Sequence, residues 1–329
     1  MSDIRISILV PVYNVGLYIA HCAETLLSQS LSAGVEYVFV DDGSTDNSIA
    51  ILESVVKRHP EAEVRIVAHN ENRGLATARK TAILAARGKY VTHVDSDDYV
   101  SLDYLATLYA AEASGADIVS GGYVAHHADG TTSEFTPRPA TDEEDAGLVA
   151  LKNEDWRIWG RLIKRNLYTQ HPDTICPGDI SDGEDLYSTP RLMHYAARVA
   201  IIPTHTYHYR TSNEHSITNT RSDRRADDLT KVWASLRDFF TSAYPDGRHA
   251  AAIGIFIADQ KANLVLNHQL SMDAIRRHAD SLQKETAPYA AALTPGRRTM
   301  LRLLHAHAWP LVWLLTLCAK IRRATRHQR

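Results

Sequence analysis

Three aspartates, Asp95, Asp97 and Asp98, stand within four residues of the stretch YVTHVDSDDYV. Like charges this close repel one another unless a cation lies among them. Carboxylate oxygens are the ligands that Mg²⁺ and Mn²⁺ prefer, and a metal held by one or two carboxylates usually shares substrate phosphates. The alternative for such a motif is a solvated turn in which Asp and Ser side chains hydrogen-bond to the backbone.

The segments around this cluster alternate between strand-like and helix-like patterns. Continuous apolar, β-branched runs predict buried strands over residues 6–12, 37–40, 64–68, 90–94 and 117–123. Helical spacing predicts helices over 18–30, 75–87 and 102–114, and another that Ser44 caps. The alternation indicates an α/β fold with right-handed βαβ units, a Rossmann-like, mostly parallel sheet and helices on both faces.

Polar clusters follow three of the predicted strands, and ligands of parallel sheets bind beyond the carboxyl ends of strands. Tyr13-Asn14 follows the first strand, Asp41-Asp42 the second and Asp95 to Asp98 the fourth. This convergence favours a ligand site over a simple turn. The chain has no GxGxxG after the first strand and no Walker A lysine, which excludes ordinary dinucleotide and P-loop sites. A nucleoside diphosphate with a metal on its phosphates fits what remains.

Four motifs resemble, in order and spacing, those of family 2 glycosyltransferases with the GT-A fold. They are PVYN (11–14), VDDGSTDNS (40–48), NRGLATAR (72–79) and VDSDD (94–98). The resemblance continues through WGRLIKRNLY (159–168) and DGEDLYSTPRL (182–192), so it covers roughly residues 4–220. Lys80 and Ala82 depart from the family, which often has asparagine and then glycine there.

The resemblance implies an inverting transfer from a UDP-sugar to a saccharide or lipid-linked acceptor in cell-surface polysaccharide or glycan synthesis. It assigns donor binding to Pro11, Tyr13, Asp41, Asp42, Asn72, Arg79, Asp95 and Ser96. Asp97, with Asp95, would hold Mn²⁺ or Mg²⁺ on the diphosphate. Asp185 would be the general base, with Glu184 in reserve. Taken alone, this acidic pair is also typical of a helix N-terminus, where it complements the dipole.

Two other functions compete with transfer. A domain of the same fold can hold a nucleotide-sugar without turnover, although Asp97 and Asp185 are both present. A nucleotidyltransferase would want a Gly-rich, basic loop after the first strand, which PVYNVGLY lacks.

Histidines and tryptophans offer further candidates near the site. His205, His208 and His215 fit a Tyr/His-rich strand and loop better than a metal site, although His215 can approach the donor phosphates or metal. Trp156 and Trp159 fit core positions better than platforms for acceptor sugars.

The pattern changes after residue 125, so three regions are expected: a catalytic domain over 1–220, a helical extension over 221–296 and a basic tail over 297–329. Residues 126–147 are expected to form a loop, 155–168 a helix or helix-turn, 199–210 a strand and 226–285 mostly helix.

The composition limits which binding partners and which cellular compartment are expected for the protein. With 329 residues and 44% apolar residues the chain can build a substantial core. A net charge of -3 argues against a nucleic-acid partner. The three cysteines are widely spaced, and the N-terminus lacks the features of a signal peptide, so a cytoplasmic protein is expected.

The C-terminal tail carries its own signal. After Glu285 no acidic residue occurs, while arginines and Lys320 flank the apolar run 309–319. A helix needs roughly 20 apolar residues to span a bilayer. The tail is therefore predicted to dock on the inner face of the cell membrane, with Trp309 and Trp313 at the interface. Packing on the protein's own domain or on a second subunit is the alternative.

Overall fold

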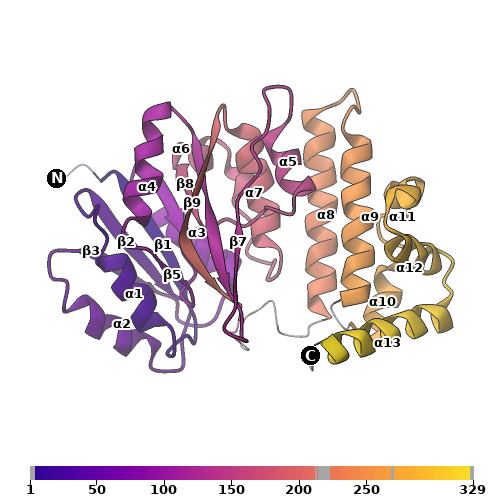
Figure 1. Ribbon diagram of the computed structural model, residues 1–329, viewed down its shortest axis with the longest axis horizontal. Helices are drawn as coiled ribbons and strands as arrows, with labels where there is room; N and C mark the ends of the chain where they lie inside the picture. The colour runs from indigo at the N-terminus through magenta and orange to yellow at the C-terminus, as the bar shows by residue number, and fades with distance from the viewer. Residues whose placement is uncertain (1–3, 212, 214–222, 268–269, 327–329) are drawn as a thin grey trace. The chain divides into compact units, whose positions relative to one another are not determined.

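The computed structural model describes residues 4–211, 213, 223–267 and 270–326. The chain divides into two compact units, Met1–Glu214 and His215–Arg329. Figure 1 shows a sheet with helices in the first unit and helices in the second.

The described part of the first unit contains a mixed nine-stranded sheet. Its main order is β3-β2-β1-β4-β8-β6-β9-β5, and β7 pairs with β6. The strands are β1 (Ile6–Val12), β2 (Val35–Asp41), β3 (Glu63–Ala68), β4 (Tyr90–His93), β5 (Tyr99–Val100), β6 (Ile118–His126), β7 (Thr132–Phe135), β8 (Arg161–Lys164) and β9 (Val199–Arg210). The first four sheet positions are parallel, and β8 runs antiparallel between β4 and β6.

Helices cover both faces of this sheet and are, in chain order, α1 (Ile19–Leu27), α2 (Ser48–Val56), α3 (Leu75–Ala85), α4 (Tyr104–Ala110), α5 (Ala146–Lys152), α6 (Asn166–Gln170) and α7 (Glu184–Tyr195). Short 3₁₀ turns lie at Ala111–Ser114 and Pro172–Thr174. One buried cluster packs β1 against α1, α2 and α4, and the other packs the sheet against α3, α5, α6 and α7. The predicted α/β fold is confirmed.

Strand β1 shows why its sequence is continuously apolar. Ile8 and Val10 belong to one core cluster, whereas Leu9, between them, belongs to the cluster on the opposite face. Successive side chains of a strand point to opposite faces, so a strand covered on both sides needs apolar residues throughout.

Three local predictions were wrong. Within 155–168, residues 161–164 form strand β8 and only 166–170 are helical. The expected loop 126–147 contains β7 and the beginning of α5. Helix α2 begins at Ser48 after Asn47, so Ser44 does not cap it; the Ser44 amide instead donates to Asp41 Oδ1 at 2.8 Å.

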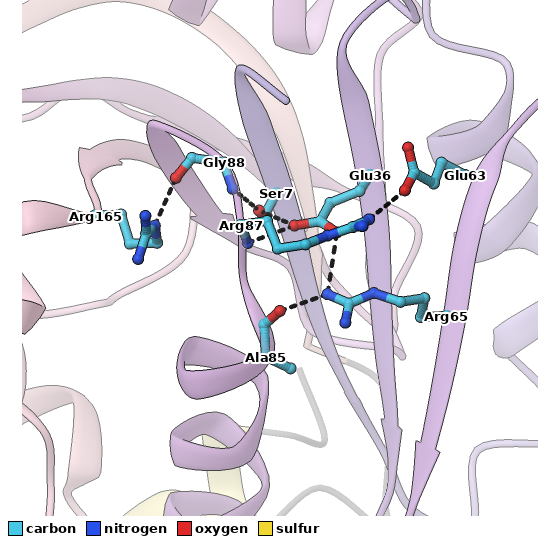
Figure 2. Close-up of polar contacts among 8 residues, drawn as sticks. All are labelled: Ser7, Glu36, Glu63, Arg65, Ala85, Arg87, Gly88 and Arg165. Carbon is cyan, nitrogen blue, oxygen red and sulfur yellow. Dashed lines mark hydrogen bonds and ion pairs between the residues drawn. The ribbon is translucent and has the colours of Figure 1, made fainter. Parts of the chain in front are cut away.

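A buried carboxylate connects several segments at the amino ends of the parallel strands, opposite the polar strand ends. Glu36 of β2 is fully buried and accepts from Ser7 Oγ at 2.5 Å, Arg65 Nη2 at 3.0 Å and the Arg87 guanidinium at 2.7 and 2.8 Å (Figure 2). Burial raises the pKa of Glu36, but these donors outweigh it and leave the pKa below its ordinary value. The network joins β1, β2 and β3 to the segment after α3.

The described part of the second unit is helical. Its helices are α8 (Arg224–Ala243), α9 (Ala250–Asn267), α10 (Met272–Ala279), α11 (Gln283–Thr286), α12 (Pro295–His305) and α13 (Trp309–Arg326), with a 3₁₀ segment at Ala287–Ala292. Ala258, Met300 and Val312, from α9, α12 and α13, share one buried cluster. Segments 221–296 and 297–329 thus contribute to one core. Among the described helices, none combines the length and apolar character needed to cross a bilayer.

Candidate active site

Three polar segments meet at one edge of the sheet because their strands are neighbours. Val12 of β1 pairs with Asp41 of β2, and Leu9 of β1 pairs with His93 of β4. The chain leaves these strands into Tyr13-Asn14, Asp42 and Asp95–Asp98 respectively. This edge therefore collects the carboxylates and amides of three loops, where ligands of parallel sheets bind.

Asp42 fixes the loop that leads into α3. It is 2% exposed, and its carboxylate accepts from the Arg73 amide at 2.9 Å and the Gly74 amide at 2.8 Å. His69 Nδ1 lies 2.6 Å from the same carboxylate. These contacts place Asp42 behind the loop, where it holds the backbone of the loop in position.

Asp41 and Asn14 shape the neighbouring loop. Asp41 Oδ1 accepts from the Ser44 amide, and Asn14, with φ 51°, accepts from the Thr45 amide at 2.8 Å. Gly43, which directly precedes Ser44, has φ 73°, and a Cβ there would lie 2.6 Å from the carbonyl carbon of Glu71. Only glycine therefore allows the two loops to approach this closely.

Two of the predicted donor-binding side chains are accessible at this edge. The Tyr13 side chain is 45% exposed, and Asn72 is exposed with its Oδ1 accepting from the Gly74 amide at 3.1 Å. Pro11 lies buried within β1, and Ser96 is also buried. The side chains of Tyr13 and Asn72 are thus accessible from solvent, whereas Pro11 and Ser96 are not.

Arg79 gathers carboxylates from distant parts of the chain into what we call the Arg79 cluster: Arg79, Asp95, Glu184 and Asp185. Its Nη2 lies 2.9 Å from Asp95 Oδ1 and 3.5 Å from Asp185 Oδ1, and its Nε lies 3.4 Å from Glu184 Oε1. Burial lowers the pKa of Arg79, but the three carboxylates outweigh burial and raise it above the ordinary value. One guanidinium thus joins α3, the β4 loop and α7.

Glu184 and Asp185 begin α7, directly after Gly183 at φ 91°. Burial raises the pKa of both carboxyls, and the pKa of Asp185 reaches about 8 despite the opposing effect of Arg79. Asp185 Oδ2 accepts from the Ile158 amide at 3.1 Å, and the side chain is 19% exposed. A carboxyl whose pKa lies near neutral pH can both take up and release a proton there.

Asp97 and Asp98 have different environments. Asp98 is fully buried and accepts from Tyr207 Oη at 2.7 Å and the Arg210 amide at 2.8 Å, so it anchors the loop to β9. Asp97 is partly exposed, and its Oδ2 accepts from Asn213 Nδ2 at 2.8 Å. Burial, and then the charge of Asp95, raises the pKa of Asp97. A bound cation would offset this crowding of negative charge.

Few side chains at the site could act as ligands of a metal ion. Over the described residues, no group of three or more His, Cys, Asp and Glu side chains is arranged to hold a metal. Asp95 and Asp97 remain, and the Asp95 side chain is 24% exposed. Mg²⁺ commonly binds through one or two carboxylates together with substrate phosphates, so this pair fits a metal that arrives with a nucleotide.

Of the described aromatic candidates, Trp159 is buried and the others are partly buried. Trp159 is 8% exposed and stacks on Tyr207 with ring centroids 4.3 Å apart, so it is a core residue. Trp156 is half-buried. His208 stacks on Tyr99 at 4.5 Å, and His205 Nε2 lies 2.9 Å from Thr136 Oγ1. His215 lies outside the described residues.

Sequence reasoning missed three side chains that support the site. Arg210 donates from Nη1 to the Asp97 carbonyl at 2.9 Å, Asn213 contacts the Asp97 carboxylate, and His69 contacts Asp42. Arg210 and Asn213 lie at and just beyond the end of β9. Polar residues at a strand end were the signal that identified the other clusters, and the same signal applies to these two.

Comparison with known proteins identifies relatives of this chain. Residues 7–180 match the family model described as glycosyl transferase family 2. The chain is 35% identical over 223 residues to EpsJ of Bacillus subtilis, described as an uncharacterized glycosyltransferase; the match covers 65% of this chain and 62% of EpsJ. It is 31% identical over 252 residues to the glycosyltransferase GlyG of Streptococcus pneumoniae, covering 71% of this chain and 79% of GlyG.

The fold also matches a solved structure. The S. aureus TarS fragment 1–349, solved in complex with UDP-GlcNAc, superimposes with a TM-score of 0.75 over 98% of this chain and 92% of the fragment. The two sequences are 18% identical, so this likeness concerns the fold.

Proposed function

Because the chain belongs to glycosyl transferase family 2, we propose that it transfers a sugar from a UDP-sugar to a saccharide or lipid-linked acceptor. The product would be a cell-surface polysaccharide or glycan. The Arg79 cluster carries this proposal, because it brings Asp95 of the donor side and Asp185 of the acceptor side to one guanidinium. The transferred sugar would lie at this junction, within residues 1–220.

The donor is proposed to carry uridine diphosphate and a hexose or aminohexose. The TarS fragment was solved with UDP-GlcNAc, which supports this class of donor for the shared fold. Exposed Tyr13 and Asn72 offer a ring and an amide to the nucleotide, and partly buried Asp41 lies at the end of β2. Asp42 contributes through the loop that it holds.

Asp97 and Asp95 are proposed to hold Mn²⁺ or Mg²⁺ on the diphosphate. Such an ion supplies electrostatic stabilisation of the negative charge that develops on the leaving diphosphate. The raised pKa of Asp97 reflects burial and the nearby charge of Asp95, which is the environment that a divalent cation relieves.

Asp185 is proposed to act as the general base in a direct displacement. The acceptor hydroxyl oxygen forms a bond to the anomeric carbon, and the bond from that carbon to the phosphate oxygen breaks. The bonding electron pair leaves with UDP, and the hydroxyl proton passes to the Asp185 carboxylate. Attack from the face opposite the leaving group inverts the anomeric configuration. Glu184 is the reserve base.

The second unit is proposed to place the enzyme at the cytoplasmic face of a membrane or against another protein. The acid-free, basic sequence after Glu285 supports attachment to a negatively charged surface. This arrangement would suit an acceptor that is itself linked to lipid.

A screen of UDP-sugars for metal-dependent hydrolysis tests the proposed activity without a known acceptor. We expect one UDP-sugar to release UDP in the presence of Mn²⁺ or Mg²⁺, with the rate abolished by a chelator. If a UDP-sugar binds but is neither hydrolysed nor transferred to any saccharide, the protein is a nucleotide-sugar-binding protein of the same fold instead.

A further inference from the structure

Helix α13 has an inner face that belongs to the core of the second unit. Val312 is fully buried, and Trp309 and Leu315 pack against the cluster that contains Leu301 and Leu304 of α12. Trp309 also stacks on His307 with ring centroids 5.2 Å apart. Of the two tryptophans predicted for an interface, Trp309 is therefore engaged by its own unit, and Trp313 remains available.

The outer face of α13 is apolar and exposed. Four of the eight large hydrophobic side chains that are exposed among the described residues lie on this helix: Leu311, Trp313, Leu314 and Ile321, exposed by 52%, 53%, 47% and 55%. Leu311, Leu314, Cys318 and Ile321 are spaced by three and four residues, so they share one stripe. We call these four residues the outer stripe. A surface helix ordinarily places polar side chains on this face, so the stripe marks a contact site.

The basic composition of the C-terminal segment favours a negatively charged partner. No acidic residue occurs from position 286 to the end of the sequence. Lys320 on α13 and Arg302 on α12 are exposed, and the helix continues through Arg322, Arg323 and Arg326. Basic residues next to Leu and Trp are the composition of helices that lie in the headgroup region of anionic membranes.

The dimensions favour a helix that lies in the plane of the membrane. From Leu311 to Ile321 the helix rises roughly 15 Å, about half the thickness of the hydrocarbon core. One long face is already buried in the protein, so the outer stripe and Trp313 are the apolar side chains of α13 that can enter lipid. A shallow insertion of that stripe satisfies both constraints.

We propose that the outer stripe of α13 docks the protein on an anionic lipid surface, with the helix parallel to the membrane plane. Docking would hold the enzyme in the plane of a lipid-linked acceptor, and only this purpose rests on the proposed function. The binding itself uses no residue of the proposed active site, so it can be measured separately from catalysis.

The sequence supplies a native position for a fluorescent probe. Cys318 is exposed within the outer stripe, whereas Cys22 and Cys176 are buried. An environment-sensitive maleimide dye should therefore label Cys318 selectively in the folded, full-length protein. We expect its emission to shift to the blue with vesicles of phosphatidylglycerol and phosphatidylcholine, and to remain unshifted with phosphatidylcholine alone. Most of the shift should be lost in about 0.5 M salt, because salt at that concentration screens the attraction between surface charges.

Substitutions that spare the core test which face binds. The double variant Leu314→Glu and Ile321→Glu changes two exposed side chains and should weaken partitioning to the anionic vesicles by on the order of tenfold or more. Leu102→Glu, at a side chain 62% exposed in the first unit, is the matched control and should leave partitioning within about twofold of wild type. Circular dichroism checks that each variant is folded.

Three results would overturn the docking proposal: no shift with anionic vesicles, an equal shift with neutral vesicles, or a shift without lipid that grows with protein concentration. The last would assign the stripe to a second copy of the chain. Calorimetry of UDP binding, performed on the same samples, separates the two proposals. Docking without UDP binding would contradict the proposed function alone, and UDP binding without docking would contradict this inference alone.

Discussion

Arg79 donates from Nη2 to Asp95 Oδ1 at 2.9 Å, and this contact joins the middle of α3 to the carboxylate cluster beyond β4. The same guanidinium faces Glu184 and Asp185 at the beginning of α7. Because Arg79 is 6% exposed, its positive charge is the main compensation for three neighbouring carboxylates. The geometry of the proposed site therefore depends on a residue that need not touch the acceptor.

Arg79→Met should destabilise the first unit. The change keeps most of the side-chain volume but leaves the carboxylates of the Arg79 cluster without their cation, and breaking a buried ion pair in this way costs about 3–5 kcal/mol. Urea denaturation followed by fluorescence measures the free energy of unfolding.

Arg58→Met is the matched control for this change. Arg58 pairs with Glu24 at the surface, where their side chains are 54% and 37% exposed. Removing an exposed pair should cost less than about 1 kcal/mol. Equal small losses in the two variants would show that the Arg79 cluster does not support the fold.

The rate should rise with pH as Asp185 loses its proton. Burial raises the pKa of Asp185 to about 8, and a general base acts only when deprotonated. We therefore expect kcat/KM for UDP release from the donor to increase as the pH rises from 6 toward that pKa, and then to level off.

Asp185→Asn should lower the rate by about 10²–10⁴-fold and remove this rise with pH, while UDP binding persists. Glu184→Gln should keep the pH dependence if Asp185 is the base. A variant at Asp185 that transfers at a near-normal rate would move the base to Glu184 or to another group.

Much of the fold was predictable because local patterns and tertiary packing agree. Residues 6–12 read as a doubly buried strand and form one, and strand β9 spans the predicted residues 199–210. Strand β8 was missed because its pattern includes Arg161, a charged residue that is fully buried. Arg161 is compatible with the core because Asp155 Oδ2 lies 2.8 Å from its Nη2, a contact that strand periodicity cannot reveal.

The candidate site likewise contains residues that the sequence could locate and contacts that it could not reveal. The carboxylates of Asp41, Asp95 and Asp97 could be located from the sequence because each follows a predicted strand. The hydrogen bonds from the amides of Arg73 and Gly74 to Asp42 could not be predicted, since they depend on how a later loop returns to β2. The contact between Arg79 and Glu184 likewise joins residues 105 positions apart.

Asp97→Ala should abolish the metal dependence of UDP binding. The change removes one of the two proposed metal-binding carboxylates and leaves the exposed Tyr13 and Asn72 in place. Calorimetry with and without Mn²⁺ measures the effect. Asp103→Ala, an exposed aspartate at the beginning of α4, is the control and should bind as wild type does. Equal affinity of the wild-type protein for UDP with and without metal would contradict the proposed metal site.

Glu36→Gln should lower the free energy of unfolding by about 1.5–3 kcal/mol at pH 7, because it removes the charge that three donors share (Figure 2). The pKa of Glu36 is lowered from 4.5, so its contribution is present above that pH and is lost as pH falls through the folded-state pKa. Urea denaturation across pH 7 to 3 should show the two proteins converging. Glu63→Gln, whose side chain is 41% exposed, should change stability little. A constant difference between wild type and Glu36→Gln over this range would contradict a charge-dependent role.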